Sequence, residues 1–106
     1  MGPELTITRL PADPGCLSVR GEIDIYTSPV LRGSLHGAVH SATPGAVITV
    51  DLSAVEFIDA RGLTTLVEAE AYATVRGTRL VFADVPAGIT RLLTITGLSL
   101  SGPEIA

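Results

Sequence analysis

A chain of 106 residues with a formal net charge of −4 is expected to form one domain, residues 1–106, whose core needs neither disulfides nor a metal. The acidic balance disfavours nucleic acid and anionic membrane surfaces as partners. No apolar run approaches the roughly 20 residues of a membrane-spanning helix, and no signal segment opens the chain. We expect a cytoplasmic protein, either a monomer or a weak homodimer.

Hydrophobic residues make up 46% of the chain and aromatic residues only 4%, so we expect a core of Val, Leu, Ile and Ala. The chain has no lysine, which excludes a P-loop lysine, a Schiff-base lysine and the lysine of a response-regulator receiver domain. Asp51 closes an apolar strand as a receiver's phosphoacceptor does. Without that lysine, and without an acidic pair after the first strand, phosphoryl transfer to Asp51 is not expected.

The N-terminal segment is typical of two paired strands. Alternation in Leu5–Leu10 predicts a strand, and the cluster Pro11–Gly15 predicts a turn. Cys16–Arg20 then predicts a second strand, antiparallel to the first because the connection is short, and Gly21 is expected to end it.

A loop and a helix are expected next. Glu22–Thr27 is predicted to be a loop, and Ser28 and Pro29 are typical of a helix start, with the hydroxyl as cap and proline at the first helical position. The buried face of this helix is predicted to carry four apolar residues with helical spacing, Leu31, Leu35, Ala38 and Ala42.

The centre of the chain is expected to hold a strand and a long helix. Ala46–Leu52 is nearly all apolar and rich in β-branched residues, which predicts a strand covered on both faces. A helix is predicted over Ala60–Arg76, with Asp59 as its N-cap and Gly77 just past its end.

The C-terminal third completes the predicted fold. Leu80–Ala83 predicts a strand, Pro86 opens a third helix that Gly97 ends, and the segment from Leu98 is expected to add a short edge strand. The resulting order predicts an α/β fold: a mixed, mostly parallel β-sheet with an antiparallel N-terminal edge strand and packed α-helices.

Catalytic and metal sites are not expected. His36 and His40 are four residues apart on one helix, a spacing that can bind a metal, but no third ligand accompanies them. Cys16 lies in an apolar run and is expected to be a small buried residue. We therefore predict neither an enzyme nor a cofactor.

Three stretches resemble the STAS domains of anti-sigma factor antagonists: Val19–Leu31 (VRGEIDIYTSPVL), Val50–Leu66 (VDLSAVEFIDARGLTTL) and Leu92–Leu98 (LLTITGL). The resemblance implies a STAS fold. It also implies binding to an anti-sigma factor, often a serine kinase of the histidine-kinase ATPase type, with release of a sigma factor. Two alternatives keep the fold and change the partner: an accessory subunit of a lipid-transport ATPase, and a part of another signalling complex.

The resemblance also implies a contact surface made of the loop Glu22–Ser28 and the helix start Asp59–Leu63. In the loop, carboxylates are available to pair with a basic partner. At the helix start we expect a cap, helix N–H groups and one projecting apolar side chain, although Asp59 could also be a purely structural cap. The candidate contact residues are Glu22, Asp24, Thr27, Ser28, Asp59, Ala60, Arg61, Gly62 and Leu63.

One position departs from the family pattern, which places a phosphorylatable serine directly after the aspartate. Here that position is Ala60, so phosphorylation, which adds roughly −1.5 to −2 charges, is not available there. Arg61 follows as a cation near a helix N-terminus, where the dipole disfavours it; it serves either a partner contact or no role. The nearest hydroxyls, Thr64 and Thr65, are expected to be ordinary helix threonines, with Thr64 a poorly placed substitute for the serine.

Overall fold

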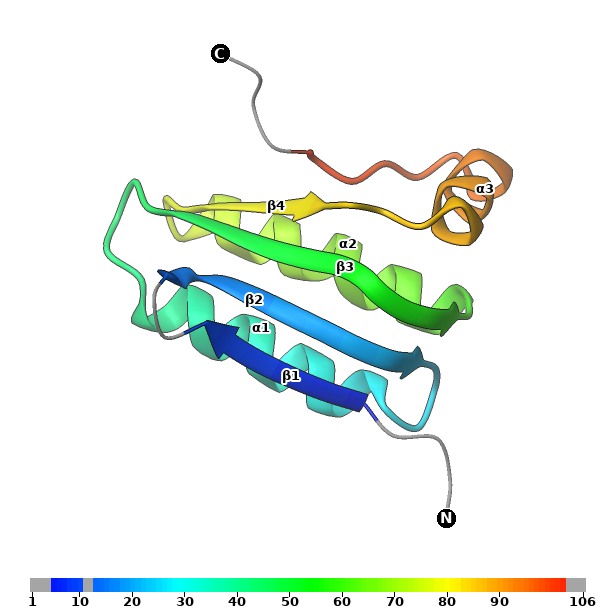
Figure 1. Ribbon diagram of the computed structural model, residues 1–106. Coiled ribbons are helices and arrows are strands. Elements are labelled where there is room, and N and C mark those ends of the chain that lie inside the picture. Colours follow the sequence, from blue (N-terminus) through cyan, green and yellow to red (C-terminus); the bar gives the residue numbers. More distant parts are fainter. Residues whose placement is uncertain (1–4, 11–12, 103–106) are drawn as a thin grey trace.

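The computed structural model describes residues 5–10 and 13–102, and a four-stranded sheet forms its centre (Figure 1). The strands are β1 (Leu5–Leu10), β2 (Asp13–Ile23), β3 (Val47–Ile58) and β4 (Arg79–Ala83), in the spatial order β1-β2-β3-β4. The first pair, β1 and β2, is antiparallel, and the β2–β3 and β3–β4 pairs are parallel. The predicted mixed sheet with an antiparallel N-terminal edge strand is confirmed.

Three helices connect the parallel strands or follow them. Figure 1 shows α1 (Ser28–Ser41) and α2 (Ala60–Val75) side by side behind the sheet, while α3 (Ala87–Thr96) lies beyond the end of β4. Because each parallel crossover passes over the same face, the two long helices cover that face together. Among the described helices, none is long and apolar enough to cross a membrane.

The core lies between α1, α2 and this face of the sheet, and it consists mainly of Val, Leu, Ile and Ala, as the composition predicts. Leu35, Leu52 and Leu66 are fully buried, from one helix, one strand and the other helix. Burying such a side chain contributes roughly 1.5–3 kcal/mol. The packing of α1 and α2 on the sheet is therefore the main source of stability.

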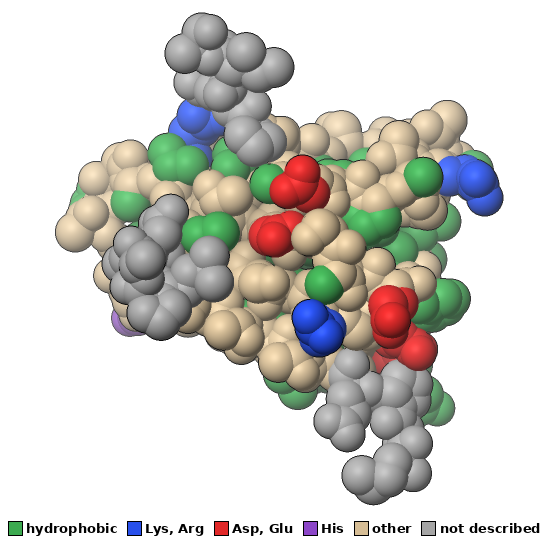
Figure 2. Space-filling view, in the orientation of Figure 1, with side chains coloured by type: hydrophobic (Ala, Val, Ile, Leu, Met, Phe, Trp, Pro, Cys, Tyr) green, Lys and Arg blue, Asp and Glu red, His purple; other side chains and the backbone are tan. Residues whose placement is uncertain are grey.

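Burial along β3 alternates, so the expectation that this strand is covered on both faces is wrong. Ile48, Val50 and Leu52 are buried, whereas Thr49 and Asp51 between them are half-buried on the other face. Figure 2 shows that face, where polar, charged and apolar side chains are mixed. The polar residues at every second position are what a strand covered by helices on one face requires.

Two strands run further than predicted. Gly21, expected to end β2, adopts φ +109° beside a register shift, and the strand continues to Ile23. Asp51, expected to close its strand, lies within β3, and its carboxylate accepts a hydrogen bond from the Ser53 N–H at 2.9 Å. Residues 11 and 12 of the predicted turn lie outside the described residues.

The glycines that end helices are confirmed, but the predicted C-terminal edge strand is wrong. Gly77 and Gly97 adopt φ +77° and +73°, the left-handed conformation that favours glycine after a helix. The segment from Leu98 to Gly102 forms no strand. Instead, Ser101 accepts a hydrogen bond from the Phe82 N–H at 2.8 Å, and its own N–H and hydroxyl donate to the Glu70 carboxylate at 2.8 and 2.7 Å.

Candidate partner-binding surface

The two segments singled out in the sequence meet at one edge of the sheet. The strands β2 and β3 are parallel neighbours, and their last residues, Ile23 and Ile58, pair with each other. The next residue, Asp59, donates its N–H to the Ile23 carbonyl at 3.1 Å. The β2–α1 loop (residues 24–27) and the start of α2 therefore leave the sheet side by side.

Asp24 and Thr27 hold the β2–α1 loop in one conformation. The Asp24 carboxylate accepts hydrogen bonds from the N–H groups of Tyr26 at 2.9 Å and Thr27 at 3.0 Å. The Thr27 hydroxyl donates to the Glu22 carbonyl at 2.8 Å and accepts from the Asp24 N–H at 2.9 Å. Local bonds of this kind fix a turn, so both side chains shape the loop.

Two residues at the loop ends differ from their expected places. Glu22 lies in β2, between the buried residues Gly21 and Ile23, so strand alternation directs its half-buried side chain to the face away from the helices. Ser28 is not a helix cap: it is the first residue of α1, it is only 5% exposed, and its hydroxyl donates to the Asp24 carbonyl. Thr27 occupies the N-cap position without a side-chain cap bond.

The predicted N-cap of α2 is confirmed. The backbone of Asp59 is extended, and its carboxylate accepts a hydrogen bond from the Gly62 N–H at 2.8 Å. An N-cap of this type contributes about 1 kcal/mol. The carboxylate therefore has a structural role in fixing where α2 begins.

Gly62 allows α2 to approach the sheet closely. A Cβ atom at this position would lie 2.5 Å from Ile23 Cγ2, 2.7 Å from the Ile23 carbonyl oxygen and 2.9 Å from Ile58 Cγ1. Separations this short are not tolerated in a packed interior, and the carbonyl belongs to the strand backbone. The glycine thus sets the distance between the two halves of the surface.

Leu63 does not project toward solvent, and the expectation of a projecting apolar side chain is wrong there. It is fully buried, on the face of α2 that also carries Leu66. Ala60, Arg61 and Thr64 are the exposed residues of the first turn. The helical period explains this, because residues three apart share a face and the apolar residues follow the core stripe.

Exposed apolar residues of the β2–α1 loop and of α1 were not among the individual contact residues predicted from the sequence. Ile25 and Tyr26 in the loop are 57% and 86% exposed, and Val30 on α1 is 58% exposed. The sequence does contain a signal for their exposure. Ile25 and Tyr26 are large apolar residues in a turn, and Val30 lies off the apolar stripe of its helix. Exposed apolar residues gathered at one place are typical of an interaction surface.

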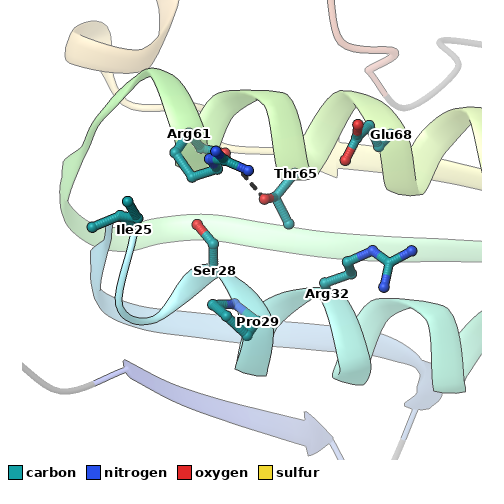
Figure 3. Close-up of a pocket in the computed structure, with 7 residues that line it drawn as sticks. All are labelled: Ile25, Ser28, Pro29, Arg32, Arg61, Thr65 and Glu68. Atoms are coloured by element: carbon teal, nitrogen blue, oxygen red, sulfur yellow. Dashed lines mark hydrogen bonds between the residues drawn. The ribbon is translucent and has the colours of Figure 1, made fainter.

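A groove of about 450 Å³ separates α1 from α2 beside the loop (Figure 3). Its lining residues are Ile25, Ser28, Pro29, Arg32, Arg61, Thr65 and Glu68. The Thr65 hydroxyl donates to the Arg61 carbonyl at 3.0 Å, and the Thr64 hydroxyl donates to the Ala60 carbonyl at 2.9 Å. Thr65 is buried and Thr64 is exposed, so of these two threonines only Thr64 has an accessible side chain.

Further along the two helices, His36 of α1 stacks on Tyr72 of α2, with ring centroids 4.3 Å apart and planes 6° apart. The Nε2 atom of His36 is buried, and it has no hydrogen-bond partner among the described residues. Burial lowers the pKa of His36, the Arg32 guanidinium lowers it further, and Glu68 opposes them. The neutral imidazole therefore fits this packing best.

The described residues contain no group of three or more His, Cys, Asp or Glu side chains that could hold a metal ion. His40 is exposed at the end of α1, while His36 is directed against Tyr72. What the surface offers chemically is apolar contact, guanidinium groups and a rigid loop, which are properties suited to binding a protein.

Comparison with known proteins gives a consistent result. Residues 7–100 match the family described as "Mlab, STAS domain". The chain is 37% identical over 81 residues to the anti-sigma-B factor antagonist of Listeria monocytogenes, an alignment that covers 76% of this chain and 69% of that relative.

Solved structures of similar proteins have the same fold. The unphosphorylated anti-sigma factor antagonist SpoIIAA superposes with a TM-score of 0.67 over 97% of this chain and 90% of its own, at 11% identity. An anti-sigma factor antagonist from Mycobacterium paratuberculosis gives a TM-score of 0.60 at 27% identity, over 91% of this chain and 79% of its own.

Proposed function

We propose, from the premise that this chain belongs to the STAS domain family of anti-sigma factor antagonists, that it binds an anti-sigma factor and thereby releases a sigma factor. The partner would be of the serine-kinase type, with a histidine-kinase ATPase fold. The function is one of binding, with no catalytic step in this chain.

The observation that supports this most is that the β2–α1 loop lies beside the start of α2. The backbone bond from Asp59 to Ile23 brings the loop that carries Ile25 and Tyr26 beside the helix start that carries Ala60 and Arg61, and Ile25 and Arg61 line one groove. Aromatic and arginine side chains are enriched at protein interfaces. We therefore assign the contact to these exposed residues, supported by Asp24, Thr27, Asp59 and Gly62.

Regulation would differ from that of an antagonist with a serine at this position. Ala60 is exposed at the first position of α2, so a hydroxyl there would be accessible to a kinase, but alanine has none. We propose that binding to the anti-sigma factor is not switched off by phosphorylation at residue 60.

Isothermal titration against each purified kinase-type anti-sigma factor of the source genome tests the proposal. Truncation of a large interface aromatic residue often costs about 2 kcal/mol, about a thirtyfold loss of affinity, so Tyr26→Ala should weaken binding at least tenfold. Val75→Ala is the matched control, because Val75 is 85% exposed at the far end of α2. Equal affinities of wild type and Tyr26→Ala would show that this surface is not the contact. Binding only to a transport ATPase would favour the alternative partner.

A further inference from the structure

The groove between α1 and α2 brings two arginines together in an acidic protein. Arg32 projects from α1 and Arg61 from α2, both are exposed, and both line the groove (Figure 3). Neither guanidinium forms an ion pair within the described part of the chain. Glu68 is the acidic residue in the lining, so the groove carries an excess of positive charge although the chain as a whole carries −4.

The two hydroxyl groups of the groove are already engaged. The hydroxyl of Ser28 donates to the Asp24 carbonyl, and the hydroxyl of Thr65 donates to the Arg61 carbonyl. In the first turn of α1, the N–H groups of Ser28, Val30 and Leu31 are also bonded. The guanidiniums are therefore the lining side chains with donors to offer. A compact phosphate site would instead converge free backbone N–H groups on one point.

The apolar residues beside the groove indicate a protein partner. Ile25 lines it and is 57% exposed, and Val30 on the same helix as Arg32 is 58% exposed. An apolar patch with arginines beside it fits a partner surface of matching shape that carries carboxylates at its rim. The Oδ1 atom of Asp24 is bonded within its own loop, and pairing of this carboxylate with a basic partner stays a prediction.

We propose that Arg32 and Arg61 receive acidic side chains of the anti-sigma factor, with Ile25 packed between the two proteins. This inference rests on the proposed function and adds the chemistry of the partner: a surface with at least two carboxylates beside an apolar contact. It also gives Arg61, placed against the helix dipole at the second position of α2, a role in binding.

Charge reversal tests this inference. Arg32→Glu and Arg61→Glu should each weaken binding to the purified kinase-type anti-sigma factor, and the double variant should lose about tenfold, because exposed pairs contribute modestly and reversal adds repulsion. Affinity should also depend less steeply on salt in the double variant than in the wild type. Arg91→Glu, an exposed arginine on α3, changes the net charge equally and should bind as the wild type does.

The outcomes separate the two proposals. If the wild type binds and the reversals bind equally well, or if Arg91→Glu weakens binding as much as they do, the acidic-partner inference is wrong while the proposed function stands. If the wild type binds none of the purified kinase-type anti-sigma factors, the proposed function fails and the inference fails with it. Circular dichroism of each variant confirms that a loss of binding is not a loss of fold.

Discussion

Gly62→Ala is expected to destabilise the protein, although replacing glycine by alanine in a helix usually stabilises it. Alanine is favoured over glycine in a helix interior by up to about 1 kcal/mol. Here the added methyl group would lie 2.7 Å from the Ile23 carbonyl oxygen and 2.5 Å from Ile23 Cγ2. Overpacking of this kind typically costs about 1–3 kcal/mol, and a strand carbonyl cannot rotate away. We expect a net loss of about 1–2 kcal/mol.

Urea denaturation measures this loss directly, and thermal denaturation should show a fall of about 4–8 °C in Tm per kcal/mol for a domain of this size. Gly33→Ala and Gly37→Ala are matched controls, because both glycines lie within α1 and an added Cβ there would have nothing within 4 Å. Both should stabilise the protein. A stabilising effect of Gly62→Ala, like that expected of the two control variants, would contradict the close approach of α2 to β2.

Three further predictions concern other residues. Asp59→Ala should lower the free energy of unfolding by about 1 kcal/mol in a urea titration, because it removes the cap bond to Gly62, whereas Asp59→Ser should retain most of it. Ala60→Ser should be phosphorylated by the kinase-type anti-sigma factor with ATP, detected as a phosphopeptide, and should then bind less well; a phosphopeptide at Thr64 of the wild type would instead show that the switch has moved. His36→Phe should reduce the loss of stability on acidification from about pH 8 to about pH 5.5. Burial lowers the pKa of His36 below 6.5 in the folded protein, so the unfolded chain takes up a proton first and acidification favours unfolding.

The histidine prediction compares two proteins that both keep an aromatic ring against Tyr72, of which only the wild type has a titratable ring at residue 36. Carboxylates titrate in both proteins, so the difference between the two urea midpoints isolates His36. An identical pH dependence would contradict the account of its burial.

Local signals made much of the fold predictable. The Asp59 cap and the glycines after α2 and α3 act through backbone bonds and φ angles that depend on a few neighbouring residues. The end of β2 was less predictable, because Gly21 also suits a bulge within a strand and only the partner strand decides between the two. The covering of β3 was less predictable, because Thr49 and Asp51 are the only polar residues in an otherwise apolar run and their alternate spacing is short.

For the candidate site, the position of the two segments was predictable from the sequence, whereas the exposure of individual side chains was less predictable. Two segments distant in sequence were expected to lie together, and the bond from Asp59 to Ile23 brings them side by side, but which side chains reach solvent depends on tertiary packing. Leu63 follows the buried stripe of α2 and Ser28 turns inward to a carbonyl, whereas Tyr26 is 86% exposed. The groove between Arg32 and Arg61 depends on the packing of α1 beside α2, which no local pattern reveals.

Sigma factor displacement tests the central claim most directly. A complex of a purified kinase-type anti-sigma factor with its sigma factor is mixed with this protein, with and without prior incubation with ATP, and free sigma factor is measured by size-exclusion chromatography. The account predicts equal release in both cases, because Ala60 has no hydroxyl to modify. No release, or release that is lost after incubation with ATP, would contradict it.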